Sequence, residues 1–131
     1  MNEDAALLAA AAAARTNASA PFSRFAVGAA LETEDGKVVT GANVENVSFG
    51  LTMCAERVAL FKALSDGYRT FKTLLIVSED LKGVLPCGAC RQVLWEFCGD
   101  IEVLSATPQG VVRRSSMQRL LPNPFDAESL P

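Results

Sequence analysis

Three of the four cysteines carry the clearest chemical signal in this chain. Cys54 stands alone, whereas Cys87 and Cys90 form a C-x-x-C pair. A single cysteine combined with such a pair is typical of a metal site rather than of a disulfide framework. The chain has no histidine, so a transition-metal site must use thiolates and carboxylates. Zn²⁺ is the expected ion, one per chain, with three protein ligands in a catalytic site or four in a structural one.

Glu56 lies two residues after the first of these cysteines. A carboxylate beside a zinc ligand is a candidate general acid and base, because it can pass protons between water and a substrate. Residues i and i+2 of a helix point nearly opposite ways, so Cys54 and Glu56 can converge only where a helix begins. The alternative is an ordinary surface glutamate in a first helical turn.

Two rival interpretations of the cysteines remain open at this point. In a closed structural site, Cys98 would be the fourth ligand. A continuous helix from Cys87 would separate Cys98 from Cys90 by about 12 Å, too far for zinc–sulfur bonds of ~2.3 Å. We therefore expect Cys98 to be a small buried hydrophobe. In a redox pair, Cys87 and Cys90 would act alone, which leaves Cys54 unexplained.

Two arginines follow the cysteine motifs directly. Three thiolates on Zn²⁺ leave a net negative charge, which makes a bound water harder to ionise. We expect Arg57, and secondarily Arg91, to hydrogen-bond to ligand sulfurs and withdraw charge from them. The alternative for each is a solvated side chain.

The elements that must position these residues follow from the apolar pattern and the turn residues. The predicted order is a helix over 4–17, strands over 26–33 and 37–43, a helix over 54–64, a strand over 71–78, a helix from Cys87 to Gly99, strands over 101–106 and 110–113, and a short helix over 117–121 before a polar tail. This order predicts one α/β domain over residues 1–131, with three layers and a five-stranded mixed sheet flanked by helices.

Composition narrows the class of protein. The net charge of −3 argues against nucleic-acid binding, because such binding needs Lys and Arg to neutralise phosphates. No apolar run approaches the ~20 residues of a membrane span. The Ala-rich stretch 7–14 follows acidic residues, so it indicates a helix rather than a signal peptide. We expect a cytoplasmic protein, where thiols stay reduced.

Five stretches together carry a family resemblance across nearly the whole chain. They are Phe25-Ala26-Val27-Gly28-Ala29-Ala30, Gly41-Ala42-Asn43-Val44-Glu45-Asn46, Cys54-Ala55-Glu56-Arg57, Pro86-Cys87-Gly88-Ala89-Cys90-Arg91-Gln92-Val93-Leu94 and Leu120-Leu121-Pro122. In these stretches the sequence closely resembles the small homotetrameric zinc-dependent cytidine deaminases. It has C-x-E where other zinc deaminases have H-x-E. Phe22 departs from the family, which usually has Tyr at this place.

The resemblance implies a reaction and a set of residues that perform it. Cys54, Cys87 and Cys90 would hold zinc, and Glu56 would shuttle protons and contact N3 of the base. The implied reaction is hydrolytic deamination of cytidine and deoxycytidine to uridine and deoxyuridine plus ammonia, as in pyrimidine salvage.

The resemblance also implies the contacts to the nucleoside. Asn43 and Glu45 would hold the ribose hydroxyls, and Phe25 would lie along the nucleoside. The backbone N–H of Ala55 would contact the carbonyl of the base or its surroundings. Phe125 would come from a neighbouring subunit of a homotetramer and cover the pyrimidine.

Three alternatives to cytidine deamination stay open. A deaminase for another aminopyrimidine, such as blasticidin S, uses a similar C-x-E and P-C-x-x-C frame, although Glu45 and the Leu120-Leu121-Pro122 stretch favour cytidine. A non-catalytic, zinc-stabilised binding module would hold zinc without an exchangeable water. A deaminase that edits RNA or DNA is disfavoured by the acidic charge balance.

Overall fold

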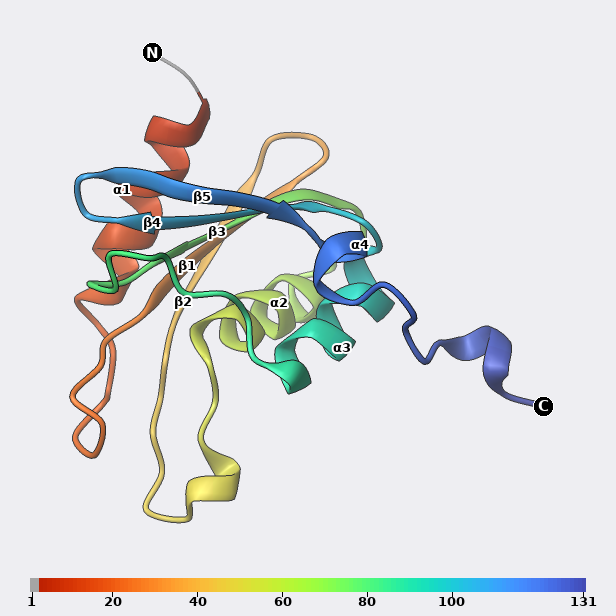
Figure 1. The fold of residues 1–131 in the computed structure, drawn as a ribbon, viewed down its shortest axis with the longest axis horizontal. Coiled ribbons are helices and arrows are strands. Elements are labelled where there is room, and N and C mark those ends of the chain that lie inside the picture. Colours follow the sequence, from red (N-terminus) through yellow and green to blue (C-terminus); the bar gives the residue numbers. More distant parts are fainter. Residues whose placement is uncertain (1–2) are drawn as a thin grey trace.

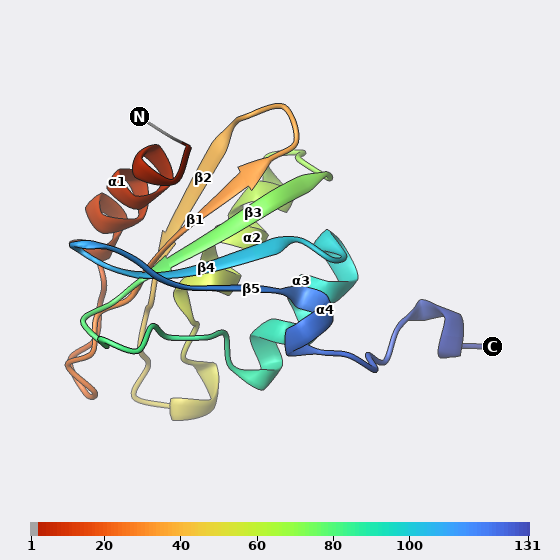
Figure 2. The same cartoon turned by 45° about the horizontal axis from the view of Figure 1, so that its top comes forward.

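A five-stranded mixed sheet forms the centre of the computed structural model, which describes residues 3–131. Its strands are β1 (Gly28–Thr33), β2 (Val38–Ala42), β3 (Phe71–Val77), β4 (Glu102–Thr107) and β5 (Gly110–Ser116). They lie in the order β2-β1-β3-β4-β5, which Figure 2 shows across the sheet. Only β3 and β4 are parallel; β1 pairs antiparallel with both of its neighbours, and β5 is antiparallel to β4.

Helices cover both faces of this sheet, which gives three layers (Figure 1). The helices are α1 (Glu3–Arg15), α2 (Ala55–Ser65), α3 (Gly88–Cys98) and the short α4 (Met117–Leu120), with single 3-10 turns at Phe49–Leu51 and Ala127–Ser129. One face packs against α1, and the other packs against α2 and α3. The predicted fold class, a three-layer α/β domain with a five-stranded mixed sheet, is confirmed.

The two apolar cores follow from the alternation of side chains along the strands. On β3, Leu74 and Ile76 point toward α2 and α3, whereas Leu75 and Val77 point toward α1. All four side chains are at least 99% buried. A strand buried on both faces is expected to read as a continuous apolar run, which explains why Leu74-Leu75-Ile76-Val77 was identifiable from the sequence.

Two glycines let helices approach the sheet closely. A methyl group on Gly28 would lie 2.1 Å from the carbonyl oxygen of Ala11 in α1. A methyl group on Gly41 would lie 2.5 Å from the backbone nitrogen of Ala59 in α2 and 2.6 Å from the carbonyl oxygen of Ala55. The second contact fixes the beginning of α2, the helix that carries Cys54 and Glu56.

All five strands differ from their predicted bounds by at least one residue, and two of them, β1 and β5, differ by two or more at one end. Ala26 and Val27 were expected in the first strand, but their backbone groups bond to side chains: Ala26 O accepts from Arg15 Nε, and Val27 N donates to Asn43 Oδ1. Strand β5 runs to Ser116 rather than ending at 113. Its last residues are polar because it is an edge strand with exposed positions, so no apolar alternation marks them.

The chain ends in a tail that leaves the body of the domain beyond α4 (Figure 1). Gly99 ends α3 as predicted: its φ is +70°, and its N–H donates to Trp95 O. Within residues 3–131, no helix combines the length and apolar character needed to cross a membrane.

Candidate three-cysteine metal centre

Two helix N-termini bring the three cysteines together. Cys54 is the N-cap of α2 and Cys87 is the N-cap of α3, both with extended backbone dihedrals. Cys90 is the third residue of α3, so it lies on the same side of the helix end as its N-cap. The partial positive charge of both helix ends is therefore directed at the thiols, where it favours thiolates.

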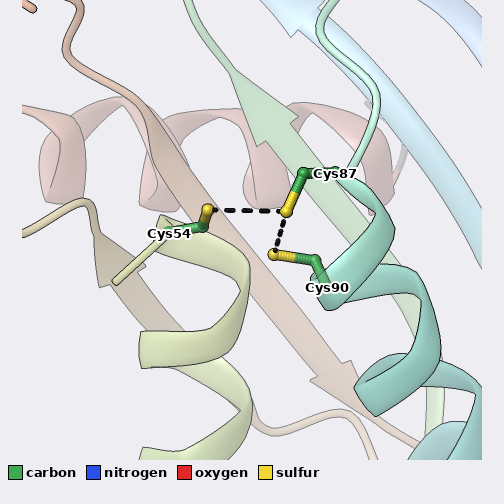
Figure 3. Close-up of side chains that lie close together, drawn as sticks. All are labelled: Cys54, Cys87 and Cys90. Atoms are coloured by element: carbon green, nitrogen blue, oxygen red, sulfur yellow. Dashed lines mark hydrogen bonds between the residues drawn. The ribbon is translucent and has the colours of Figure 1, made fainter. Parts of the chain in front are cut away.

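The thiols point toward one another across the gap between the helices (Figure 3). The sulfur of Cys87 lies 3.8 Å from that of Cys54 and 3.5 Å from that of Cys90. Three ligands at tetrahedral angles with zinc–sulfur bonds of ~2.3 Å would be about 3.8 Å apart. The donor set therefore fits zinc in both chemistry and spacing.

The fourth cysteine takes no part in this cluster. Among the described residues, the group whose ligand atoms all lie within 4.8 Å of one another consists of Cys54, Cys87 and Cys90. Cys98 ends α3 and packs against the apolar core, where burial raises its pKa to about 12. The closed four-cysteine site is therefore not formed, and the expectation of a small buried hydrophobe agrees with the structure.

Arg57 lies against the sulfur cluster. Its Nη2 donates to the sulfur of Cys54 over 3.7 Å. The pKa of Cys54 is lowered to about 5, by the hydrogen bond from Cys90 first and by Arg57 and Cys87 in addition, against an opposing effect of burial. The pKa of Cys90 is raised, by its interaction with Cys54 first and by burial in addition. This contact is the one expected for Arg57.

Arg91 differs from its expected contact. Its Nε donates to the carbonyl oxygen of Pro86 at 2.7 Å, and its Nη1 donates to that of Leu120 at 2.9 Å. Within the described residues its guanidinium thus ties the start of α3 to the end of α4 rather than bonding to a ligand sulfur. Two backbone carbonyl oxygens are thus the acceptors of Arg91, where a ligand sulfur was expected.

Glu56 is buried beside the cysteines, with 3% of its surface exposed. It is the second residue of α2, so it follows the N-cap Cys54 around the end of the helix. Burial raises the pKa of Glu56 to about 7, and the nearby Cys54 adds to the rise while Arg57 opposes it. A buried carboxyl group with a strongly raised pKa next to a metal site is a typical proton-transfer group.

A cavity of about 270 Å³ opens onto Glu56 and the cysteines. Its lining comes from both helix starts, from the loops that precede them and from the loop before β1: Ser23, Phe25, Val27, Asn43, Glu45, Thr52, Met53, Cys54, Ala55, Glu56, Val84, Leu85 and Cys87. Most of these side chains are apolar, and the polar ones are those of Ser23, Asn43, Glu45, Thr52 and Glu56. Such a composition suits a small, flat molecule with polar edges.

The two predicted sugar ligands lie in this cavity wall, and both also bond to the loop before β1. Asn43 Oδ1 accepts from Val27 N, and its Nδ2 donates to Phe25 O, each at 2.9 Å. Glu45 Oε1 accepts from Phe22 N and Ser23 N. Each side chain keeps part of its hydrogen-bonding capacity for another partner.

The remaining predicted contacts divide into two groups. Phe25 and Ala55 line the cavity, and the N–H of Ala55 opens α2, where backbone donors have no intrahelical acceptor. Phe125 does not line the cavity of its own chain. It lies in the tail, 60% exposed, with its carbonyl oxygen bonded to Gln92 Nε2.

Sequence reasoning missed several cavity residues. Thr52, Met53, Val84 and Leu85 line it from loops, as does Ser23. Met53 pairs with Val44 in an isolated bridge, which folds the loop after β2 back on itself. Loop residues of these types occur everywhere on proteins, so no sequence signal marked them.

Taken together, two helix N-termini with three thiols, a buried carboxyl group and an adjacent cavity define an open metal centre for hydrolytic chemistry on a small molecule. Residues 1–105 match the cytidine and deoxycytidylate deaminase zinc-binding region, and the chain belongs to this family. It is accordingly a zinc-dependent deaminase with one zinc site per chain, as predicted from the sequence.

Individual relatives agree with this assignment. The cytidine deaminase of Halalkalibacterium halodurans is 49% identical over 118 residues, which cover 89% of each chain. The crystal structure of cytidine deaminase from Burkholderia pseudomallei superposes with a TM-score of 0.88 at 52% identity, covering 95% of this chain and all of that one. The blasticidin-S deaminase of Bacillus cereus is less similar, at 29% identity over 73% of this chain.

Proposed function

We propose that the protein converts cytidine and deoxycytidine to uridine and deoxyuridine with release of ammonia. The observation that carries this proposal is that one cavity is lined both by Cys54, Cys87 and Glu56, beside the three-cysteine cluster, and by Asn43 and Glu45. The first group supplies the hydrolytic chemistry, and the second matches a sugar diol. The similarity to cytidine deaminases supports the choice of substrate.

The three cysteines and Glu56 have different roles in the proposed reaction. Zinc, when bound by the three thiolates, supplies a water activated for attack on C4 of the base. Glu56 takes a proton from that water and places it on N3. It then carries the second proton to the amine, so that a C–O bond replaces the C–N bond and ammonia leaves.

Binding of the nucleoside rests on the cavity wall. Asn43, Glu45 and Phe25 line the cavity. Asn43 and Glu45 would provide a donor and acceptors for the ribose hydroxyls, and Phe25 would lie along the nucleoside. Ala55 is the first residue of α2, and its N–H would donate to the carbonyl of the base. The proposed substrate is an uncharged nucleoside. It has no phosphate group, so the cavity does not need a cluster of basic side chains to bind one.

The test is the loss of cytidine absorbance with purified protein. We expect turnover with zinc bound, none after zinc removal, and recovery when zinc is added back. Cys87→Ala should abolish zinc binding and turnover, whereas Cys98→Ala should keep both, because Cys98 packs in the core away from the cluster. Zinc content is measured by atomic absorption for each variant.

Two results would contradict the proposal. Turnover that survives in the metal-free Cys87→Ala variant would exclude the cysteine cluster from the reaction. Release of ammonia from blasticidin S, with none from cytidine or deoxycytidine, would assign the site to a different aminopyrimidine.

We further propose that the protein is a cytoplasmic homotetramer acting in pyrimidine salvage. Phe125 of one subunit would then cover the pyrimidine in the cavity of another. The homotetramer is supported by exposed aromatic residues: Phe125 in the tail, and Phe22 and Phe49, which line a hollow that shares Ser23, Glu45 and Thr52 with the cavity. Light scattering of the zinc-loaded protein gives the mass of the assembly directly.

A further inference from the structure

The carboxylate of Glu45 accepts hydrogen bonds from the loop that precedes β1. Its Oε1 accepts from the backbone N–H groups of Phe22 at 2.9 Å and Ser23 at 3.0 Å. Its Oε2 accepts from the hydroxyl of Ser23. Successive backbone N–H groups that converge on one point form an anion-binding concavity. Phe22 and Ser23 together therefore hold this carboxylate by three hydrogen bonds.

The backbone of the loop is held in an unusual conformation by local hydrogen bonds. Arg24 has a φ of +58°, which places a non-glycine residue in the left-handed region. Its N–H donates to the carbonyl oxygen of Ala20 at 2.9 Å. This turn directs the N–H groups of Phe22 and Ser23 at Glu45.

Two hydrogen bonds, one accepted and one donated, fix the orientation of the Ser23 hydroxyl. Its oxygen accepts from the N–H of Phe25 at 3.0 Å, and its proton goes to Oε2 of Glu45. A serine hydroxyl has one proton to donate, so its direction is settled by these two bonds. The same contacts lower the pKa of Glu45, with the Ser23 hydroxyl as the largest cause.

Counting acceptor positions shows what remains for a ligand. A carboxylate has about four lone-pair positions. The two N–H groups and the hydroxyl use three of them, which leaves one on Oε2. Ser23 and Glu45 both line the cavity. The remaining position is thus available to a donor in the cavity, and its direction depends on Ser23.

We infer that Ser23 is a positioning residue for sugar recognition, which aims a single acceptor position of Glu45 at one hydroxyl of the bound nucleoside. This inference rests on the proposed function, because it concerns sugar binding in the same cavity. Ser23 acts through Glu45 and takes no part in proton transfer. Its loss should therefore weaken substrate binding and leave the chemical step unchanged.

The test combines Ser23→Ala with removal of the sugar hydroxyls. For cytidine, we expect Ser23→Ala to raise KM about tenfold with kcat unchanged, as for loss of a hydrogen bond to a charged group. For 2′,3′-dideoxycytidine, which has no hydroxyl to offer Glu45, the substitution should leave KM unchanged. If the effect of Ser23→Ala on KM depends on the presence of the sugar hydroxyls, the Ser23 side chain and those hydroxyls are energetically coupled, as expected for an interaction through Glu45. Ser23→Thr, which keeps the hydroxyl, should restore most of the KM for cytidine.

A merely structural role for Ser23 would give a different pattern. It would raise KM equally for both substrates, or lower kcat, and either result overturns the inference. An unchanged KM for cytidine also overturns it. Calorimetric titration with uridine gives the same comparison without turnover, and zinc content and melting temperature should match those of the wild type. Failure of the proposed function is distinguishable, because the wild-type protein would then not deaminate cytidine at all.

A matched pair at Arg24 tests the loop conformation independently. Arg24→Gly should keep the KM for cytidine, because glycine adopts a φ of +58° without steric cost. Arg24→Val should raise it, because a β-branched residue disfavours that region and the N–H groups of Phe22 and Ser23 would turn away from Glu45. Equal KM values for the two variants would show that the loop does not position the carboxylate.

Discussion

Replacement of Arg57 by Gln tests whether one guanidinium compensates the charge of the three thiolates. Arg57 Nη2 lies 3.7 Å from the sulfur of Cys54. At that separation, unit charges interact by about 1 kcal/mol in water and about 4 kcal/mol near a protein surface. Arg57 is partly exposed, so screening favours the lower part of this range. We expect the pKa of Cys54 to rise by about one to two in the variant, since about 1.4 kcal/mol corresponds to one pKa unit.

The direction of the pH effect follows from the proton balance. Zinc binds the thiolate, so zinc affinity falls as the pH drops through the pKa of the thiol. A higher pKa in Arg57→Gln moves this fall to higher pH, and the variant should differ more from the wild type at pH 6 than at pH 8. We expect a loss of about 10- to 100-fold in zinc affinity, with zinc still bound at micromolar concentrations and the activity profile shifted to higher pH.

The assay is competition for zinc with a chromophoric chelator across this pH range, together with the pH profile of kcat/KM. Arg91→Gln is the matched control, because that guanidinium binds the carbonyl oxygens of Pro86 and Leu120. It should lower stability while keeping the wild-type pH dependence of zinc affinity. The charge-compensation argument is refuted if Arg57→Gln leaves both profiles unchanged, or if the two variants shift them equally.

Two further predictions concern the proton-transfer group and the placement of α2. Glu56→Gln should keep the fold and the zinc but lower kcat by several orders of magnitude, as measured by cytidine turnover and metal analysis; near-native turnover would contradict the role of Glu56. Gly41→Ala should cost about 1–3 kcal/mol of unfolding free energy through overpacking against α2, measured by urea unfolding. Gly50→Ala, where the added methyl meets nothing within 4 Å, is its control and should be nearly neutral; equal losses in both would exclude the steric explanation.

The metal centre was accessible from the sequence because its signals are local. The C-x-x-C spacing and Pro86 place a helix start at Cys87, and the structure places Cys87 and Cys54 as N-caps of α3 and α2. The requirement that Glu56 share a site with Cys54 at a helix end also came from helix geometry alone. The relative position of the two helices could not be predicted from the sequence, because the sheet determines it.

Other features depend on long-range partners that no local pattern encodes. The strand order β2-β1-β3-β4-β5 places the strand from the middle of the chain at the centre of the sheet. Arg91 follows a motif just as Arg57 does, yet its partners are carbonyl oxygens, one of them in α4. The bonds from Glu45 to residues 22 and 23 likewise join segments that lie more than twenty positions apart in the sequence.

The cysteine cluster joins parts of the chain that are far apart in sequence. Cys54 and Cys87 are separated by 33 positions, and the segment between them contains α2 and β3. An ion shared by both ends closes this segment into a ring, so its binding free energy also counts toward folding. The supply of zinc during expression and storage should therefore govern the yield, the shelf life and the protease resistance of the protein as well as its turnover.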